Sequence, residues 1–136
     1  MNIKKSISGL AILSAFFLLF FSCSLETKTQ QPFLIYADSI QSPDTVDAGV
    51  VFEVKLFGII GPNGCYKLEK IYSYQNYENE VMIEPWGVYI YDGTACSAGI
   101  SYLTGKTEIT ITEPGDYTLK VIRPDYTYLD KTVTVN

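Results

Sequence analysis

The sequence predicts an all-β fold, an antiparallel β-sandwich of seven or eight short strands. Three observations lead to this prediction. Short apolar stretches recur at intervals of roughly 8–12 residues, with turn residues between them. No segment keeps a helical periodicity over ten residues. The chain of 136 residues also contains 11 tyrosines, and aromatic side chains fit the pleated, half-buried surface of a sheet.

The clearest single strand, residues 51–57, places Phe52, Val54 and Leu56 on one face and two charged residues on the other. Such alternation is typical of a half-buried antiparallel strand, with one face on the core and one in water. Glycine, proline and asparagine are concentrated on either side of it, and these residues favour turns. The neighbouring elements, one strand and two turn-rich loops, are expected at residues 33–40, 42–49 and 58–64.

The next strand, residues 66–74, alternates imperfectly because Lys70 shares a face with Leu68 and Tyr72. A β-bulge or a position at the edge of a sheet would account for this irregularity. Proline lacks the N–H group that a sheet requires, so Pro85 is expected to interrupt the strand that follows. The elements after residue 74, a turn and two strand segments, are expected at residues 76–79, 81–84 and 88–91.

The residue pattern in the last part of the chain predicts one loop and three strands. The loop, residues 92–99, contains Cys96. In the second of the strands Tyr117, Leu119 and Val121 share one face, which is therefore expected to be buried. The three strands are expected at residues 107–112, 117–122 and 129–135.

The segment Glu113-Pro114-Gly115-Asp116-Tyr117 leads into the second of these strands. It resembles the turn before the penultimate strand of immunoglobulin-like and fibronectin-type domains. This resemblance implies an immunoglobulin-like sandwich in which Tyr117 is the corner tyrosine, with its hydroxyl bonded to the backbone a few residues upstream. The sequence departs from the immunoglobulin pattern at Leu119, where a cysteine would follow Tyr117 by two residues. Cys65 and Cys96 therefore do not correspond to the immunoglobulin disulfide.

The N-terminus has the features of a bacterial export signal. Lys4 and Lys5 precede an apolar run, residues 9–21, which is shorter than the ~20 residues that a permanent membrane helix needs. The small residue Ser22 then stands directly before Cys23. This arrangement resembles the lipobox of bacterial lipoproteins, and the chain as a whole resembles the small immunoglobulin-like lipoproteins of Gram-negative bacteria.

The resemblance implies cleavage before Cys23 and attachment of lipid to that cysteine. Phe20 and Phe21 are bulkier than the usual lipobox residues, and an ordinary secretory signal or an N-terminal anchor helix are the alternatives. Ser24 stands where aspartate would resemble an inner-membrane retention signal, so the outer membrane is expected as the location. The expected organisation is a signal peptide, a lipidated cysteine with a polar tether, and one β-sandwich domain, at residues 1–22, 23–31 and 32–136.

The chain contains three cysteines. If Cys23 carries lipid, Cys65 and Cys96 remain as a pair in an oxidising compartment, where a disulfide is the default expectation. This disulfide would join the start of the third strand to a loop and contribute on the order of 3–4 kcal/mol. Two independent buried thiols or a metal-binding pair are the alternatives, although the chain has no histidine to complete a metal site.

Charge and composition limit the possible functions. Without the predicted signal peptide, the chain has eight basic and fifteen acidic residues and therefore a net charge of −7. Nucleic acid is not expected as a partner, because its phosphates would repel this domain, and membrane attachment is expected through lipid rather than a basic patch. The absence of histidine excludes Ser-His-Asp and Cys-His catalysis. Hydrolysis by a pair of carboxylates is the catalytic alternative that remains, and a sandwich of this size rarely builds the deep cleft it needs. We expect no enzymatic activity, no cofactor and no metal site.

A group of aromatic residues is the main candidate for a ligand surface. On their strand Tyr89 and Tyr91 lie opposite Val88 and Ile90, and an open face there could bind sugar rings or a protein partner. The alternative is that neighbouring strands cover the face and the tyrosines serve as amphipathic packing. The residues of this group are Tyr72, Tyr74, Tyr77, Trp86, Tyr89 and Tyr91.

The sequence thus predicts a lipid-anchored binding or accessory protein of the cell envelope. One alternative is a carbohydrate-binding module that uses Trp86, Tyr89 and Tyr91. A second alternative is a structural or inhibitor-like partner of another envelope protein, engaged through residues 58–64 or 92–99. An exposed flat row of aromatic residues would favour carbohydrate, and a protruding rigid loop beside Cys96 would favour a protein.

Overall fold

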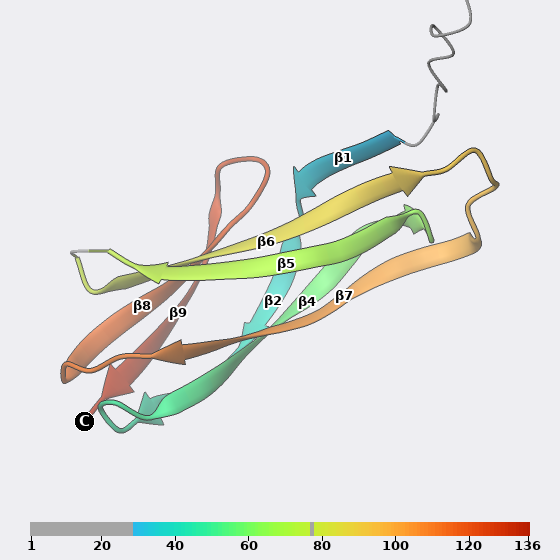
Figure 1. Ribbon diagram of the computed structural model, residues 1–136. Coiled ribbons are helices and arrows are strands. Elements are labelled where there is room, and N and C mark those ends of the chain that lie inside the picture. Colours follow the sequence, from blue (N-terminus) through green and yellow to red (C-terminus); the bar gives the residue numbers. More distant parts are fainter. Residues whose placement is uncertain (1–28, 77) are drawn as a thin grey trace, which may run out of the picture.

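The computed structural model of the protein describes residues 29–76 and 78–136 (Figure 1). Within these residues the chain forms nine strands in two sheets and no helix, which confirms the predicted all-β class and its sandwich-like arrangement. No helix of this part has the length and apolarity that a membrane span requires. The strands are β1 (Thr29–Leu34), β2 (Ala37–Gln41), β3 (Thr45–Val46), β4 (Val51–Asn63), β5 (Tyr66–Gln75), β6 (Glu80–Tyr91), β7 (Ala98–Thr110), β8 (Gly115–Ile122) and β9 (Tyr128–Val135).

The large sheet has six strands and is organised around β6. Along one edge β6 pairs with β5 over most of its length. Along the other edge its first part pairs with β8 and its second part with β1. The remaining strands follow in the order β8, β9, β3. The small sheet consists of β2, β4 and β7, with β4 in the middle.

Two pairings run parallel, so the prediction of a wholly antiparallel sandwich is wrong for them. They are β6 with β8 and β3 with β9. The first arises because β5 folds back on β6 and takes the edge of the sheet, which leaves β6 as the neighbour of β8. The chain returns to β8 through β7 in the other sheet, so β6 and β8 point the same way.

The core lies between the two sheets. It is built by the alternation of each strand, because every second side chain points inward. In β6, for example, Val81 and Ile83 are buried, and in β8 Tyr117, Leu119 and Val121 are buried as predicted. Among the described residues no polar or charged residue is buried. The other fully buried members include Ile35, Val54, Leu56, Leu103, Ile111 and Val133.

Several element boundaries differ from the predicted ones. The expected loop at residues 58–64 is mostly strand, because β4 continues to Asn63 opposite the start of β7. Pro85 does not interrupt β6, contrary to the prediction. The pairing of β6 with β8 ends at Ile83, and the pairing with β1 begins at Trp86. Pro85 lies between the two pairings, where its lack of an N–H group costs no hydrogen bond with either strand. The single strand expected at residues 33–40 is divided between β1 and β2, and the expected loop at residues 42–49 contains the short β3.

Other local predictions are confirmed. The irregular strand β5 has both expected features, since its register shifts between Leu68 and Lys70 and it pairs only with β6, at the edge. The hydroxyl of the buried Tyr117 donates a hydrogen bond to the backbone oxygen of Glu113 at 3.2 Å, as expected of a corner tyrosine. The predicted signal and the lipidation site Cys23 lie outside the described residues. The structure places the end of the predicted tether, Thr29–Gln31, within β1.

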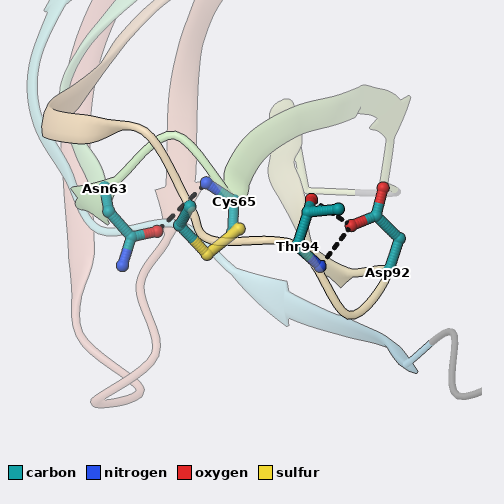
Figure 2. Close-up of a disulfide and its surroundings, with 5 residues drawn as sticks. Asn63, Cys65, Asp92 and Thr94 are labelled. Carbon is teal, nitrogen blue, oxygen red and sulfur yellow. Dashed lines mark hydrogen bonds between the residues drawn. A yellow bond between two sulfur atoms is a disulfide. The ribbon is translucent and has the colours of Figure 1, made fainter.

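Cys65 and Cys96 form the predicted disulfide, with a Cα–Cα distance of 5.3 Å (Figure 2). Two independent thiols and a metal-binding pair are thereby excluded. The bond joins the start of β5 to the loop before β7, and a backbone hydrogen bond from Gly64 to Ser97 lies beside it. Asn63 accepts a hydrogen bond from the Cys65 amide at 3.0 Å. This end of the sandwich is therefore fixed by covalent and hydrogen bonds together.

Candidate functional site

The alternation of β6 divides the predicted aromatic group between two faces. Because Val81 and Ile83 point into the core, Trp86 points outward. Tyr89 is three residues from Trp86 and therefore belongs to the other face of the strand. Its ring packs on Tyr66 with 4.9 Å between the ring centroids. The structure thus corrects the proposed surface: Tyr89 and Tyr91 lie on the opposite face of β6 from Trp86. Tyr77 lies outside the described residues.

Tyr72 and Tyr74 of β5 share the outward face with Trp86. The register pairs Tyr72 with Glu84 and Tyr74 with Met82, so the two tyrosines flank the outward residues of β6. Tyr72 is 47% exposed and Tyr74 is 49% exposed. On this face of the large sheet the side chains form an open aromatic row rather than packing under another layer.

Glu84 lies at the centre of this row. Its Oε1 accepts a hydrogen bond from the hydroxyl of Tyr74 at 3.0 Å. Its Oε2 accepts a hydrogen bond from the indole nitrogen of Trp86, also at 3.0 Å. One carboxylate therefore fixes two aromatic rings on adjacent strands. We call the outward residues Tyr72, Tyr74, Glu84, Trp86 and Tyr128 the aromatic face.

Tyr128 extends the aromatic face across β8 to β9. The ammonium of Lys120 lies 5.4 Å from its ring centroid. Lys120 also forms an ion pair with Glu80 at 2.5 Å, and Asn76 donates a hydrogen bond to the same carboxylate at 2.7 Å. At the opposite side the ammonium of Lys70 lies 4.6 Å from the ring of Tyr72. Cations thus flank the outer tyrosines of the face.

These contacts set the ionisation of the face. The hydrogen bond to Glu84, followed by partial burial, raises the pKa of Tyr74, so its hydroxyl stays protonated and remains a donor. The hydrogen bond from Lys120, and then the one from Asn76, lowers the pKa of Glu80. The same ion pair raises the pKa of Lys120. The charged forms at the edge of the face are therefore the stable ones near neutral pH.

A shallow pocket of about 170 Å³ adjoins Tyr74, where the end of β5 approaches the end of β7. Its rim is polar and includes Ser73, Gln75 and Glu108, while Val81 and Ile109 form its apolar floor. A second pocket, of about 350 Å³, lies near the end of β2 on the small sheet. The residues around that pocket are Gln41, Ser42, Pro43, Glu53 and Lys55.

No family model, no curated protein and no solved structure matches this chain. Within residues 29–76 and 78–136, no three acidic or cysteine side chains come together in a way that could hold a metal ion. The sulfur atoms of Cys65 and Cys96 are joined to each other, so neither is a free nucleophile.

Sequence reasoning missed two members of the aromatic face, Glu84 and Tyr128. The sequence could have placed Glu84 on this face, because it is two residues from Trp86 and lies in the strand expected at residues 81–84. Tyr128 stands one residue before the strand expected at 129–135, and β9 begins with it. Its proximity to β5 and β6 depends on the order of the strands, which the local pattern does not contain.

Proposed function

We propose that this protein is a lipoprotein of the cell envelope, acylated on Cys23, whose β-sandwich is a non-catalytic module that binds glycans. The anchor is supported by the apolar run before Ser22-Cys23. The disulfide between Cys65 and Cys96 is in keeping with an oxidising compartment outside the cytoplasm. The absence of a basic excess leaves lipid as the means of attachment, with the outer membrane as the expected location.

The aromatic face is the observation that carries the glycan proposal. The C–H faces of sugar rings stack on aromatic rings, and their hydroxyl groups bond to carboxylates and phenols. Tyr72, Tyr74 and Trp86 supply the rings on two adjacent strands, and Glu84 supplies acceptor oxygens between them. The flanking Lys120 is neutralised by Glu80, so the face suits an uncharged glycan better than an acidic one.

Trp86 provides a direct assay, because it is the only tryptophan in the chain. Titration of the protein with soluble oligosaccharides from a glycan array should change the emission of Trp86 in a saturable way. Trp86→Ala lacks this fluorescence signal, so its binding is measured by isothermal titration instead. The substitution should weaken binding by at least about tenfold, as expected for a central aromatic residue of a binding surface. Tyr126→Ala is a matched control, since Tyr126 is an exposed tyrosine of the β8–β9 loop that is 89% exposed. Unchanged binding by Trp86→Ala would contradict the glycan proposal.

The anchor is tested separately. Cys23→Ala should abolish incorporation of labelled palmitate and move the protein from the membrane fraction to the soluble fraction. The disulfide should be unaffected, because its two cysteines are remote in sequence from the change. Palmitate labelling that persists in Cys23→Ala would refute the lipoprotein assignment.

We also infer that the sandwich is immunoglobulin-like. The hydrogen bond from Tyr117 to the backbone of Glu113 supports this inference, and so does the parallel pairing of β3 with the last strand, β9. The chain departs from the usual strand order where β6 lies between β5 and β8. An experimental structure that retained this strand order would place the protein in a variant of that fold.

A protein partner is the second candidate, favoured by the loop between β6 and β7. This loop is held by the disulfide at Cys96, and Asp92 accepts hydrogen bonds from the backbone and the hydroxyl of Thr94 (Figure 2). A rigid loop loses little entropy when it binds. Cross-linking from Ala95→Cys in intact cells would support this candidate if it captured one defined protein and if Trp86→Ala left that capture unchanged.

A further inference from the structure

The outer face of the small sheet has two unlike halves. In the half next to the disulfide, Leu56–Asn63 of β4 and Ala98–Gly105 of β7 contain no charged residue. The other half is charged, with Glu53 bridging Lys55 and Lys106. Exposed apolar and aromatic side chains occupy the uncharged half, namely Phe57, Ile59, Ile100 and Tyr102. We call these four residues the apolar half-face; Asp38, at the bulge of β2, lies at its border.

These side chains are adjacent in the sheet. The register pairs Ile59 with Tyr102, and both side chains are exposed, Tyr102 to 64%. Ile100 follows on the same side of β7 and is half exposed. Isolated exposed apolar residues are common on protein surfaces, but a contiguous and uncharged group indicates contact with something.

The apolar half-face lies at the end of the sandwich where the described chain begins. Thr29, the first residue of β1, pairs with Tyr91 at the end of β6. The amide of Ile90 bonds to the carbonyl of Cys65, directly after the end of β4. Figure 1 shows the start of β1 at the same end of the molecule as the end of β4 and the start of β7.

We propose that the apolar half-face rests on the lipid bilayer that holds the acylated Cys23. This inference rests on the lipid anchor of the proposed function. Only residues 24–28 separate Cys23 from Thr29, and a fully extended chain of that length spans about 20 Å. The end of the sandwich that carries Ile59, Ile100 and Tyr102 is therefore held close to the membrane surface.

The composition of the half-face fits this occupant. Isoleucine and phenylalanine side chains gain free energy at the boundary of the acyl chains, and tyrosine favours the headgroup level, where its hydroxyl stays hydrated. The domain is acidic, so attraction to anionic lipid does not explain an attachment here. An uncharged contact surface avoids both the desolvation of charges and repulsion by lipid phosphates.

This orientation has a consequence for the glycan site. The two outer faces of a sandwich point in opposite directions, because the sheets pack on each other through their inner faces. With the apolar half-face on the bilayer, the aromatic face of the large sheet points away from it. Trp86 is then open to glycans that approach from the aqueous side.

The test uses the acylated protein, purified from membranes and placed in phosphatidylcholine vesicles with brominated acyl chains, which quench tryptophan at short range. In a Trp86→Phe background, Tyr102→Trp should be strongly quenched. Thr110→Trp is the matched control on the same face of the same strand, eight residues further along, and should be quenched several-fold less. The unaltered protein should show little quenching of Trp86 by bromine, and iodide in the aqueous phase should quench Trp86 as strongly with vesicles as without them.

The possible outcomes distinguish a failure of the proposed orientation from a failure of the proposed lipid anchor. Acylated protein in which Tyr102→Trp and Thr110→Trp are quenched equally little, or in which Trp86 itself is quenched by bromine, overturns the orientation and leaves the anchor intact. Protein recovered without acyl mass on Cys23 overturns the anchor and the orientation with it. Protection of Tyr102→Trp from iodide in native membranes, but not in pure lipid vesicles, would replace the bilayer with a protein partner.

Discussion

The outer faces of the two sheets both expose aromatic rings, and they differ in what surrounds those rings. On the large sheet Tyr74 and Trp86 donate hydrogen bonds to the shared carboxylate of Glu84. On the small sheet Ile59 and Tyr102 form an adjacent pair within an uncharged region. The first surface offers rings together with acceptor oxygens, which suits a polyhydroxylated ligand. The second offers apolar area alone, which suits a bilayer. The two faces therefore differ in the polar groups beside their rings rather than in the exposure of the rings.

The largest expected effect tests this contrast with two exposed tyrosines. Tyr72→Ala should weaken glycan binding about tenfold, whereas Tyr102→Ala should leave the affinity within about twofold of the unaltered protein. Isothermal titration with the best ligand of the glycan array measures both. Equal losses in the two variants would mean that the faces do not have separate roles.

The reverse experiment examines the bilayer side. Ile100→Glu places a charge in the apolar half-face and should abolish the vesicle-dependent protection of β7 amides in hydrogen exchange. Tyr72→Ala should retain that protection. If Ile100→Glu kept the protection, the bilayer contact would have to lie elsewhere on the domain.

A smaller effect is expected from removing single hydroxyl groups. Tyr117→Phe removes the hydrogen bond from the buried Tyr117 side chain to the backbone oxygen of Glu113 and should lower the free energy of unfolding by about 1 kcal/mol. Tyr74→Phe removes an exposed hydrogen bond and should change it by no more than about 0.5 kcal/mol. Chemical denaturation of both variants provides the comparison, and an equal cost would argue against Tyr117 as a structural corner.

The smallest effect concerns the ion pairs of the two faces. In Lys120→Met the pKa of Glu80 should rise toward its ordinary value of 4.5, because the main cause of its lowering is gone. In Lys106→Met the pKa of Glu53 should rise less, since Lys55 stays 3.3 Å away. Carboxyl titration by NMR measures both shifts, and a larger rise for Glu53 than for Glu80 would contradict this account.

The sign of the pH effect follows from these shifts. Both carboxyl groups have a lower pKa in the folded protein than in the unfolded chain. Their contribution to stability is therefore complete above about pH 4.5 and is lost as the pH falls through the lowered pKa values. Acid unfolding of Lys120→Met should accordingly lack the share of the pH dependence that Glu80 supplies.

The sequence was sufficient for features that depend on neighbouring residues. Alternation identified the inward faces of β4 and β8. The misplaced Lys70 indicated a bulge or an edge position, and β5 has both. The resemblance of the turn before Tyr117 to that of immunoglobulin-like domains implied its hydrogen bond. The inward faces follow from local geometry, in which side chains two residues apart share a face.

Features that depend on strand order were not accessible. Nothing near β6 shows that its neighbour is the distant β8, or that Pro85 stands between two pairings and therefore does not end the strand. For the same reason, the sequence could assign Tyr89 and Val88 to opposite faces of their strand but could not show which of the two faces is covered. The open face became known only from the partners of β6, and with it the roles of Glu84 and Tyr128.

The pairings of β9 affect how the chain folds. β8 pairs with β9 along its whole length, and Thr45 of β3 pairs with Thr134 near the end of the chain. Asn136 completes this closure, because its amide bonds to Val46 and its carbonyl oxygen accepts from Ala48. The pairings of β3 with β9 join segments that lie far apart in the sequence. Contacts of this kind slow folding, because a long loop must close before the contacts can form.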